Sequence, residues 1–268
     1  MHKIIVFSVP RSGSSWLGAI LGRHAKVKYR FQPIHSYTFR KSISAQSSLE
    51  EIDEFFFELW GSGDPYVRRE SLATNVDDNV APESVAETHL VFKEVHDFPA
   101  IANCVERDKS VSLIGLVRDP VDVIKSWVHS PREWSSKWRI EDEWFSASKK
   151  NREYRGNHFG VMHWLETTQG LLRLSEEHPT RIRIQTYAEL KADTNPAISR
   201  ILSFSGLEND PNIERFLRDS RAGMDEDPYS VMRGNVPDYH DSSLPVTIAD
   251  AIRDLVRREG LGDFLRSS

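Results

Sequence analysis

Cysteine is scarce in this sequence, and long apolar runs are missing. The single Cys104 among 268 residues excludes an intrachain disulfide framework and a structural zinc site built on cysteines. No apolar run comes near the roughly 20 residues that a membrane-spanning helix needs, and the first apolar stretch is too short for a signal peptide. The composition predicts a soluble, cytosolic, globular protein without a membrane span.

An excess of positive charge is also missing. Lysine and arginine number 35 against 40 acidic residues, which gives a net charge of -5 and a pI near 6.1. No basic surface field therefore predicts binding to nucleic acid or anionic lipid, and an anionic ligand must be bound by a local cluster of cations and amides. No metal site is expected, because His158 and His163 lie five residues apart and do not share one helical face.

Apolar β-branched runs alternate with helical patterns along the chain, which is typical of a mainly parallel sheet with helices on both faces. We expect strands at residues 3–8, 27–31, 89–94, 111–117 and 181–187. We expect helices at residues 14–23, 120–130, 159–177 and 247–259, and helix starts at the capping box of Ser48, at Asn195-Pro196 and at Asp210-Pro211. Residues 61–88, 131–157 and 219–245 are expected to be irregular and to gather around a site. No linker separates two cores, so we predict one α/β domain over residues 1–268.

A loop suited to anions lies between the first strand and the first helix. Its residues are Pro10, Arg11, Ser12, Gly13, Ser14, Ser15 and Trp16. Small residues let consecutive amides face one anion at a helix N-terminus, and Arg11 adds a permanent, fork-shaped charge. No lysine follows Gly13, which excludes a Walker A loop, and one glycine is too few for a dinucleotide-binding loop. An ordinary turn capped by Ser14 would explain the small residues but would give Arg11 no role.

This loop resembles the 5′-phosphosulfate loop of the sulfotransferase family, whose members use 3′-phosphoadenosine 5′-phosphosulfate (PAPS) as donor. A second stretch resembles the family's 3′-phosphate element and places Arg118 and Ser126 at the positions that bind this phosphate. Tyr187 matches a tyrosine that contacts adenine, and Arg233 and Gly234 match an element that closes over the 3′-phosphate. The resemblance implies a P-loop-like strand–loop–helix fold with PAPS as co-substrate and no metal. The ordinary alternative is an arginine paired with a nearby aspartate and a serine on a solvated helix face.

Sulfuryl transfer requires a base that takes the proton of the acceptor hydroxyl. The glutamate that several family members use corresponds here to Gln32, which does not accept a proton usefully at neutral pH. Other members place the base after a Lys-Thr-His segment, and the matching text here ends in Glu94-Val95-His96, shifted by one residue. If the strand runs as far as His96, Glu94 and His96 share one of its faces, and we predict that one takes the proton and the other holds it in place. His35 is a third candidate; alternatively, Glu94 and His96 only pair at the strand end.

The predicted function is in-line transfer of a sulfuryl group from PAPS to a hydroxyl of a small-molecule alcohol or glycan, with Arg11 stabilising charge on the leaving phosphate. A catalytically silent nucleotide-binding module is one alternative, because Gln32 stands at the position of the base. A P-loop kinase for a small molecule is another, and the missing loop lysine disfavours it. No nucleic-acid partner is expected, and the sequence leaves the acceptor and the oligomeric state open.

Overall fold

Five parallel strands form one sheet in the computed structural model, which describes residues 1–69, 86–154, 156–223, 225, 227, 229–232 and 244–266. The strands are β1 (His2–Phe7), β2 (Val27–Phe31), β3 (His89–Glu94), β4 (Val111–Val117) and β5 (Ile182–Thr186). Their order is β2-β3-β1-β4-β5, and every neighbouring pair is parallel. The carboxyl ends of all five strands therefore meet at one edge. The predicted strands are confirmed to within one residue at each end.

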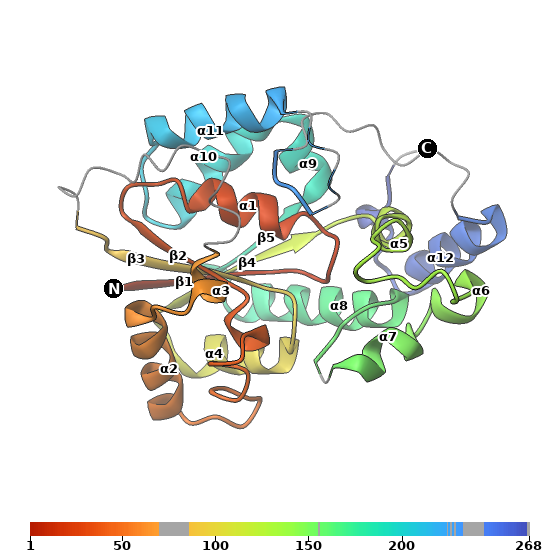
Figure 1. Cartoon of the computed structure of the whole chain (residues 1–268), viewed down its shortest axis with the longest axis horizontal. Coiled ribbons are helices and arrows are strands. Elements are labelled where there is room, and N and C mark those ends of the chain that lie inside the picture. Colours follow the sequence, from red (N-terminus) through yellow and green to blue (C-terminus); the bar gives the residue numbers. More distant parts are fainter. Residues whose placement is uncertain are drawn as a thin grey trace.

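Helices cover both faces of the sheet, which confirms the predicted α/β class (Figure 1). One face carries α1 (Ser14–Leu21), α9 (Tyr187–Ala192), α10 (Thr194–Phe204) and α11 (Pro211–Ala222). The other carries α2 (Leu49–Gly61), α4 (Phe98–Arg107) and α8 (Val161–Glu177). Toward one end of the molecule lie α5 (Pro120–Val128), α12 (Val246–Arg258) and the short helices α6 (Ile140–Glu143) and α7 (Ser148–Glu153). The remaining short elements are η1 (Pro33–His35), α3 (Pro65–Arg68) and η4 (Gly262–Phe264).

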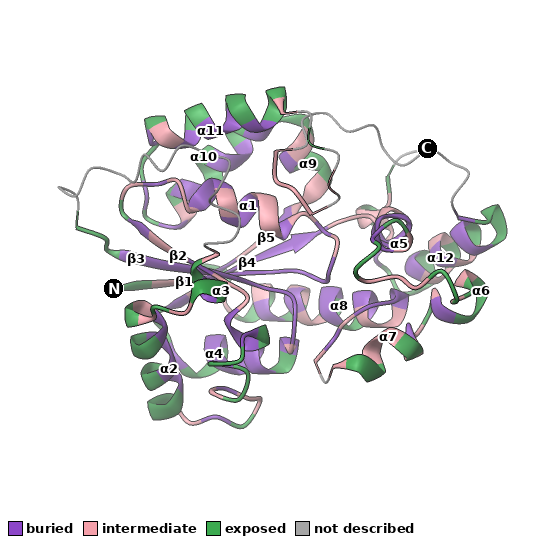
Figure 2. Ribbon diagram, in the orientation of Figure 1, coloured by how far each residue is buried: buried purple, intermediate pink, exposed green. Residues whose placement is uncertain are grey.

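The central strands β1 and β4 are apolar on both sides because both faces of the sheet are covered. In β1, Ile4 and Val6 pack into the core under α1, α10 and α11, whereas Ile5 and Phe7 pack into the core on the opposite face. All four side chains are buried, as is most of the sheet (Figure 2). Burying each such side chain contributes about 1.5–3 kcal/mol. The sheet is thus a rigid support for the loops at its carboxyl edge.

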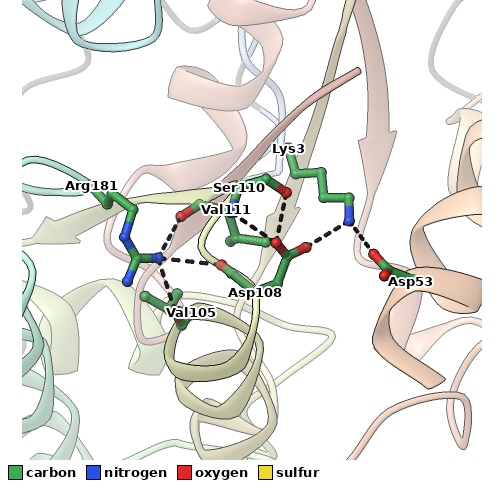
Figure 3. A network of polar contacts seen from close by, with 7 residues as sticks. All are labelled: Lys3, Asp53, Val105, Asp108, Ser110, Val111 and Arg181. Carbon is green, nitrogen blue, oxygen red and sulfur yellow. Dashed lines mark hydrogen bonds and ion pairs between the residues drawn. The ribbon is translucent and has the colours of Figure 1, made fainter. Parts of the chain in front are cut away.

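A buried polar network ties the opposite, amino-terminal edge of the sheet together (Figure 3). Lys3 Nζ lies 2.6 Å from a carboxylate oxygen of Asp108 and 2.6 Å from one of Asp53. Asp108 also accepts hydrogen bonds from the backbone N–H and the hydroxyl of Ser110. Arg181 donates to the backbone carbonyls of Val105 at the end of α4, of Asp108 and of Val111 at the start of β4. Burial alone would raise the pKa of Asp108, but Lys3 and Ser110 hold it below its ordinary value. The network joins β1 and α2 to the turn before β4 and to the start of β5.

Several helices differ from the sequence-based predictions. The helix expected to start at Asn195 begins at Thr194 after Asp193, because a proline is tolerated throughout the first turn and does not identify the cap. Helix α4 was not expected, although Asp97 accepts a hydrogen bond from the N–H of Ala100 at its start. Short helices α3, α6 and α7 interrupt stretches expected to be irregular. The capping box at Ser48 and the cap at Asp210 are confirmed.

Within the described part of the chain, no helix combines the length and the apolar character needed to cross a bilayer.

Candidate active site at the carboxyl edge of the sheet

The loop after β1 turns sharply into α1. Arg11 and Gly13 both have positive φ angles, 70° and 94°, and Gly13 precedes the first residue of the helix. The hydroxyl of Ser8 donates a hydrogen bond of 2.8 Å to that of Ser14, which fixes the two sides of the turn. Ser12 is buried, and its Oγ has no hydrogen-bond partner among the described residues. The turn thus leaves a buried hydroxyl donor unused at the start of a helix, where anions are favoured.

Arg118 and Tyr187, which directly follow β4 and β5, both contact this loop. Nη1 of Arg118 donates to the backbone carbonyl of Arg11 at 3.0 Å, and its guanidinium lies 4.8 Å from the centre of the Tyr187 ring. The ring of Tyr187 packs so closely on Gly13 that a Cβ there would come within 2.6 Å of it. Nε1 of Trp164 donates to the carbonyl of Arg118 at 2.9 Å. At position 13, glycine is therefore required both for the close packing of the Tyr187 ring and for the positive φ.

The guanidinium of Arg11 lies among three side chains from later parts of the chain. Its Nε donates to the hydroxyl of Ser126 at 3.4 Å, and its Nη1 lies 3.6 Å from Oε2 of Glu133. The ring of Tyr229 covers its face at 5.0 Å. The structure therefore brings Arg11, Arg118, Ser126 and Tyr187 together and adds Glu133, which was not singled out from the sequence.

Glu94 and His96 form a buried pair where β3 ends. Oε1 of Glu94 accepts hydrogen bonds from Nδ1 of His96 at 2.8 Å and from the backbone N–H groups of Val95 and His96. Oε2 accepts from the N–H of Ile34 at 2.9 Å. Burial alone would raise the pKa of Glu94, but these donors hold it below its ordinary value. The carboxylate is thus ionised and fixes the proton of His96 on Nδ1.

His35 stacks on this pair. Its ring lies 4.5 Å from that of His96, with 14° between the planes, and Tyr154 packs edge-on against both rings. Loss of hydration, followed by the neighbouring His96, lowers the pKa of His35 to about 4. The hydroxyl of Tyr154 donates to the carbonyl of Ile34 at 3.0 Å, which holds the aromatic group in place. The three candidates for the base therefore lie in one cluster.

Lys93 is a site residue that the sequence analysis missed. It lies inside β3, is only 3% exposed and places Nζ 5.0 Å from the centre of the Phe31 ring. Burial lowers its pKa to about 7, although Glu94 partly offsets this effect. A lysine within an otherwise apolar strand was the available signal, because such a charge is rarely buried without a role.

The other predicted residues have simpler outcomes. Gln32 has a positive φ of 42°, and its Oε1 accepts a hydrogen bond of 3.1 Å from the hydroxyl of Tyr66. Arg233 and Gly234 lie outside the described residues. No group of three metal-ligating side chains occurs in the part of the chain that the structure describes. Of the other residues expected in the anion loop, Pro10 lies in the turn before α1, and Ser15 and Trp16 lie in the first turn of the helix.

Comparisons with known proteins relate the chain to one family. A family model described as a sulfotransferase domain matches residues 1–223. Cytosolic sulfotransferase 14 of Arabidopsis thaliana is 26% identical over 214 residues, which cover 76% of this chain and 53% of that relative. The chain therefore spans about half the length of this curated relative. A crystal structure of mouse sulfotransferase SULT7A1 complexed with PAP has the same fold, with a TM-score of 0.58 and 16% identity, covering 98% of this chain and 86% of that chain.

Proposed function

Because this chain belongs to the sulfotransferase domain family, we propose that it transfers a sulfuryl group from PAPS to a hydroxyl of a small-molecule alcohol or glycan. One observation carries the proposal: Arg11, Arg118 and Tyr187, from three distant segments, meet at the loop after β1. An ordinary Ser/Gly turn requires no such convergence. The mouse relative was crystallised with PAP, the desulfated form of PAPS, and the curated relative is named a cytosolic enzyme; we propose the same donor and compartment here.

The donor-binding residues fit an anionic nucleotide. Ser12 Oγ and Arg118 Nε are both buried atoms without a hydrogen-bond partner among the described residues. In our proposal the loop amides and Arg11 bind the 5′-phosphosulfate, Arg118 and Ser126 bind the 3′-phosphate, and Tyr187 contacts the adenine. The donor, when bound, supplies the sulfuryl group and a phosphate leaving group. Arg11 stabilises the negative charge that grows on this phosphate during transfer.

Proton transfer is assigned to Glu94 and His96. Glu94 is completely buried and its oxygens are occupied by four donors, so it acts as a positioning residue. His96 donates from Nδ1 to Glu94, which leaves Nε2 to take the proton of the acceptor hydroxyl. His35 is a poor base at neutral pH, since burial lowers its pKa to about 4. In this assignment Gln32 takes no part in proton transfer.

Lys93 is proposed as a second group acting on the leaving phosphate. Its pKa near 7 allows both the charged and the neutral form at neutral pH. A charged Lys93 adds to the stabilisation that Arg11 provides, and it can also give a proton to the leaving oxygen. Its complete burial in β3 fixes it on the supporting sheet rather than on a loop.

Binding of three nucleotides tests the donor assignment. We expect isothermal titration to show that PAP binds more tightly than adenosine 5′-phosphate or ATP. Arg118→Ala should weaken PAP binding roughly tenfold or more, because a hydrogen bond to a charged group is worth about 1.5–3 kcal/mol, and it should spare adenosine 5′-phosphate. Arg139→Ala is the matched control, since that side chain is largely exposed and pairs with Glu141. Equal losses for both nucleotides would refute the 3′-phosphate site, and a preference for ATP would favour a kinase.

Turnover separates an enzyme from a silent binding module. The wild-type protein is incubated with radiolabelled PAPS and a panel of phenols, aliphatic alcohols and sugars. We expect label to reach at least one hydroxyl acceptor. Tight PAP binding without transfer to any member of the panel would instead favour the binding module.

A further inference from the structure

Glu133 lies in the turn that follows α5, and the backbone of this turn is firmly held. The N–H of Glu133 donates to the carbonyl of Ser130 at 2.9 Å, and the carbonyl of Glu133 accepts from Nε1 of Trp127 at 3.1 Å. The next residue, Trp134, packs edge-on against the buried ring of Trp127 at 4.9 Å. The backbone at Glu133 is therefore held in place by the packing of this turn on α5.

The carboxylate of Glu133 points at the guanidinium of Arg11. Its Oε2 lies 3.6 Å from Nη1 of Arg11, and the two side chains are 23% and 12% exposed. This oxygen is buried and has no hydrogen-bond partner among the described residues. The charge of Glu133 also raises the pKa of Lys93. One carboxylate thus acts on both cations that the proposed function assigns to the leaving phosphate.

Tyr229 and Arg132 complete this arrangement. The hydroxyl of Tyr229 accepts a hydrogen bond of 2.8 Å from the N–H of Arg132, and its ring lies 4.5 Å from the Arg132 guanidinium and 5.0 Å from that of Arg11. The same ring therefore contacts Arg11 and is tied to the turn that carries Glu133. Arg11 is held from two directions without any nucleotide.

We propose that Glu133 is an internal competitor of the anionic donor for Arg11. The inference rests on the proposed function, because the competing ligand is the 5′-phosphosulfate of PAPS or the 5′-phosphate of PAP. A nucleotide 5′-phosphate that binds Arg11 must either displace the carboxylate of Glu133 or bind beside it against electrostatic repulsion. Either cost weakens nucleotide binding. The same cost speeds the release of PAP after transfer. Glu133 therefore sets the affinity of the site for nucleotides and does not bind them.

Removing the charge of Glu133 tests this proposal. Glu133→Gln preserves the shape of the side chain, and its Kd for PAP, measured by isothermal titration, should fall roughly three- to thirtyfold, as expected for loss of one partly buried ionic competitor. Glu141→Gln is the matched control: it removes the same charge from an exposed pair with Arg139 and should leave the Kd unchanged. In an Arg11→Ala background, Glu133→Gln should tighten binding much less, because the contested cation is gone and only the direct repulsion and the effect on Lys93 remain.

The outcomes distinguish this inference from the proposed function. If the wild type binds PAP and Glu133→Gln binds it equally or more weakly, Glu133 is not a competitor, and weaker binding would show that it orients Arg11 for the donor. If the tightening is undiminished in the Arg11→Ala background, the effect does not pass through Arg11 and the inference is wrong. If neither the wild type nor Glu133→Gln binds PAP, the donor assignment fails and the inference with it. Stopped-flow release of PAP should slow in Glu133→Gln by the same factor as the Kd falls.

Discussion

The four hydrogen bonds that Glu94 accepts make Glu94→Gln an informative substitution. Oε1 accepts from Nδ1 of His96 at 2.8 Å and from the N–H groups of Val95 and His96 at 2.8 and 3.1 Å, while Oε2 accepts from the N–H of Ile34 at 2.9 Å. A glutamine keeps three of these bonds if its oxygen takes the place of Oε1. Its amide group then faces the N–H of Ile34, donor against donor. The variant thus loses one bond and the negative charge beside His96.

The size of the effect follows from this charge. A hydrogen bond to a charged group is worth about 1.5–3 kcal/mol, and each 1.36 kcal/mol of barrier changes a rate tenfold, so kcat should fall roughly 10- to 150-fold. His96→Ala removes the base itself and should cost more, roughly 10²–10⁴ in rate. PAP affinity should change little in either variant, because the hydrogen bonds given above for the two side chains do not involve the loop that holds Arg11, and the bond from the N–H of Ser8 to the backbone carbonyl of Glu94 is kept in both. Loss of a hydrogen-bond partner at Ile34 should also lower the melting temperature of Glu94→Gln.

Single-turnover transfer from labelled PAPS, with PAP binding and melting curves measured in parallel, separates these effects. His163→Gln is the control, because His163 pairs with the exposed Glu166 and does not belong to the proposed proton pathway. A folded Glu94→Gln variant with the wild-type rate would refute the role of Glu94 as positioning residue. A loss of PAP binding in proportion to the loss of rate would place Glu94 in donor binding instead. Loss of turnover in His35→Ala alone would move the base to η1.

Three further predictions concern the donor loop and the opposite edge of the sheet. Arg11→Ala should reduce the single-turnover rate by roughly 10²–10³, and Arg11→Lys should retain part of it; a change in PAP affinity alone would contradict the assigned role. Asp108→Asn should lower the free energy of unfolding in urea by about 1–3 kcal/mol, whereas Asp53→Asn, whose side chain is 58% exposed, should cost under about 1 kcal/mol. Because the pKa of Asp108 is lowered from 3.8 in the folded protein, the contribution of Asp108 to the free energy of unfolding is fully present above pH 3.8 and is lost as the pH falls through the lower, folded pKa. The same pH dependence of stability in the wild type and in Asp108→Asn would contradict this. Gly13→Ala should lower both the melting temperature and PAP affinity, since φ is 94° and the new Cβ would lie 2.6 Å from Tyr187; an unchanged melting curve would show that the turn tolerates a side chain.

The central strands β1 and β4 could be predicted because burial on both faces makes each one a short, nearly continuous apolar run, whereas the edge strands β2 and β5 show alternation of apolar and polar residues. Helix α4 escaped prediction for a physical reason. Its N-terminal cap, Asp97, adopts a positive φ of 52°, and a proline follows in the first turn, a combination that equally suits an ordinary turn. The start of α10 was misplaced because Pro196 marks a first turn without fixing which residue precedes it.

The site residues that could be predicted are those whose own sequence segment indicates where they lie. Arg11 and Arg118 each follow an apolar strand, so their convergence at one edge of a parallel sheet could be anticipated. The pairing of Glu94 with His96 was anticipated from a strand that would run to His96, but β3 ends at Glu94, and the pair is held instead by the N–H and Nδ1 of His96 donating to the carboxylate. Glu133 lies in an irregular stretch, and its approach to Arg11 depends on how Trp127 and Trp134 pack, which no local pattern encodes.

The place of β1 in the centre of the sheet has a consequence for biosynthesis. His2 pairs with His89 and Lys3 with Val111, so neither neighbour of β1 exists until roughly 90 to 110 further residues have been made. At about 5–20 residues per second, the apolar strand waits roughly 5–20 seconds for a partner. During that interval the nascent chain carries an unpaired, aggregation-prone apolar strand that includes Ile4, Ile5, Val6 and Phe7. Nascent chains that stall before β4 is made should therefore be bound by chaperones that recognise short, extended, apolar peptides.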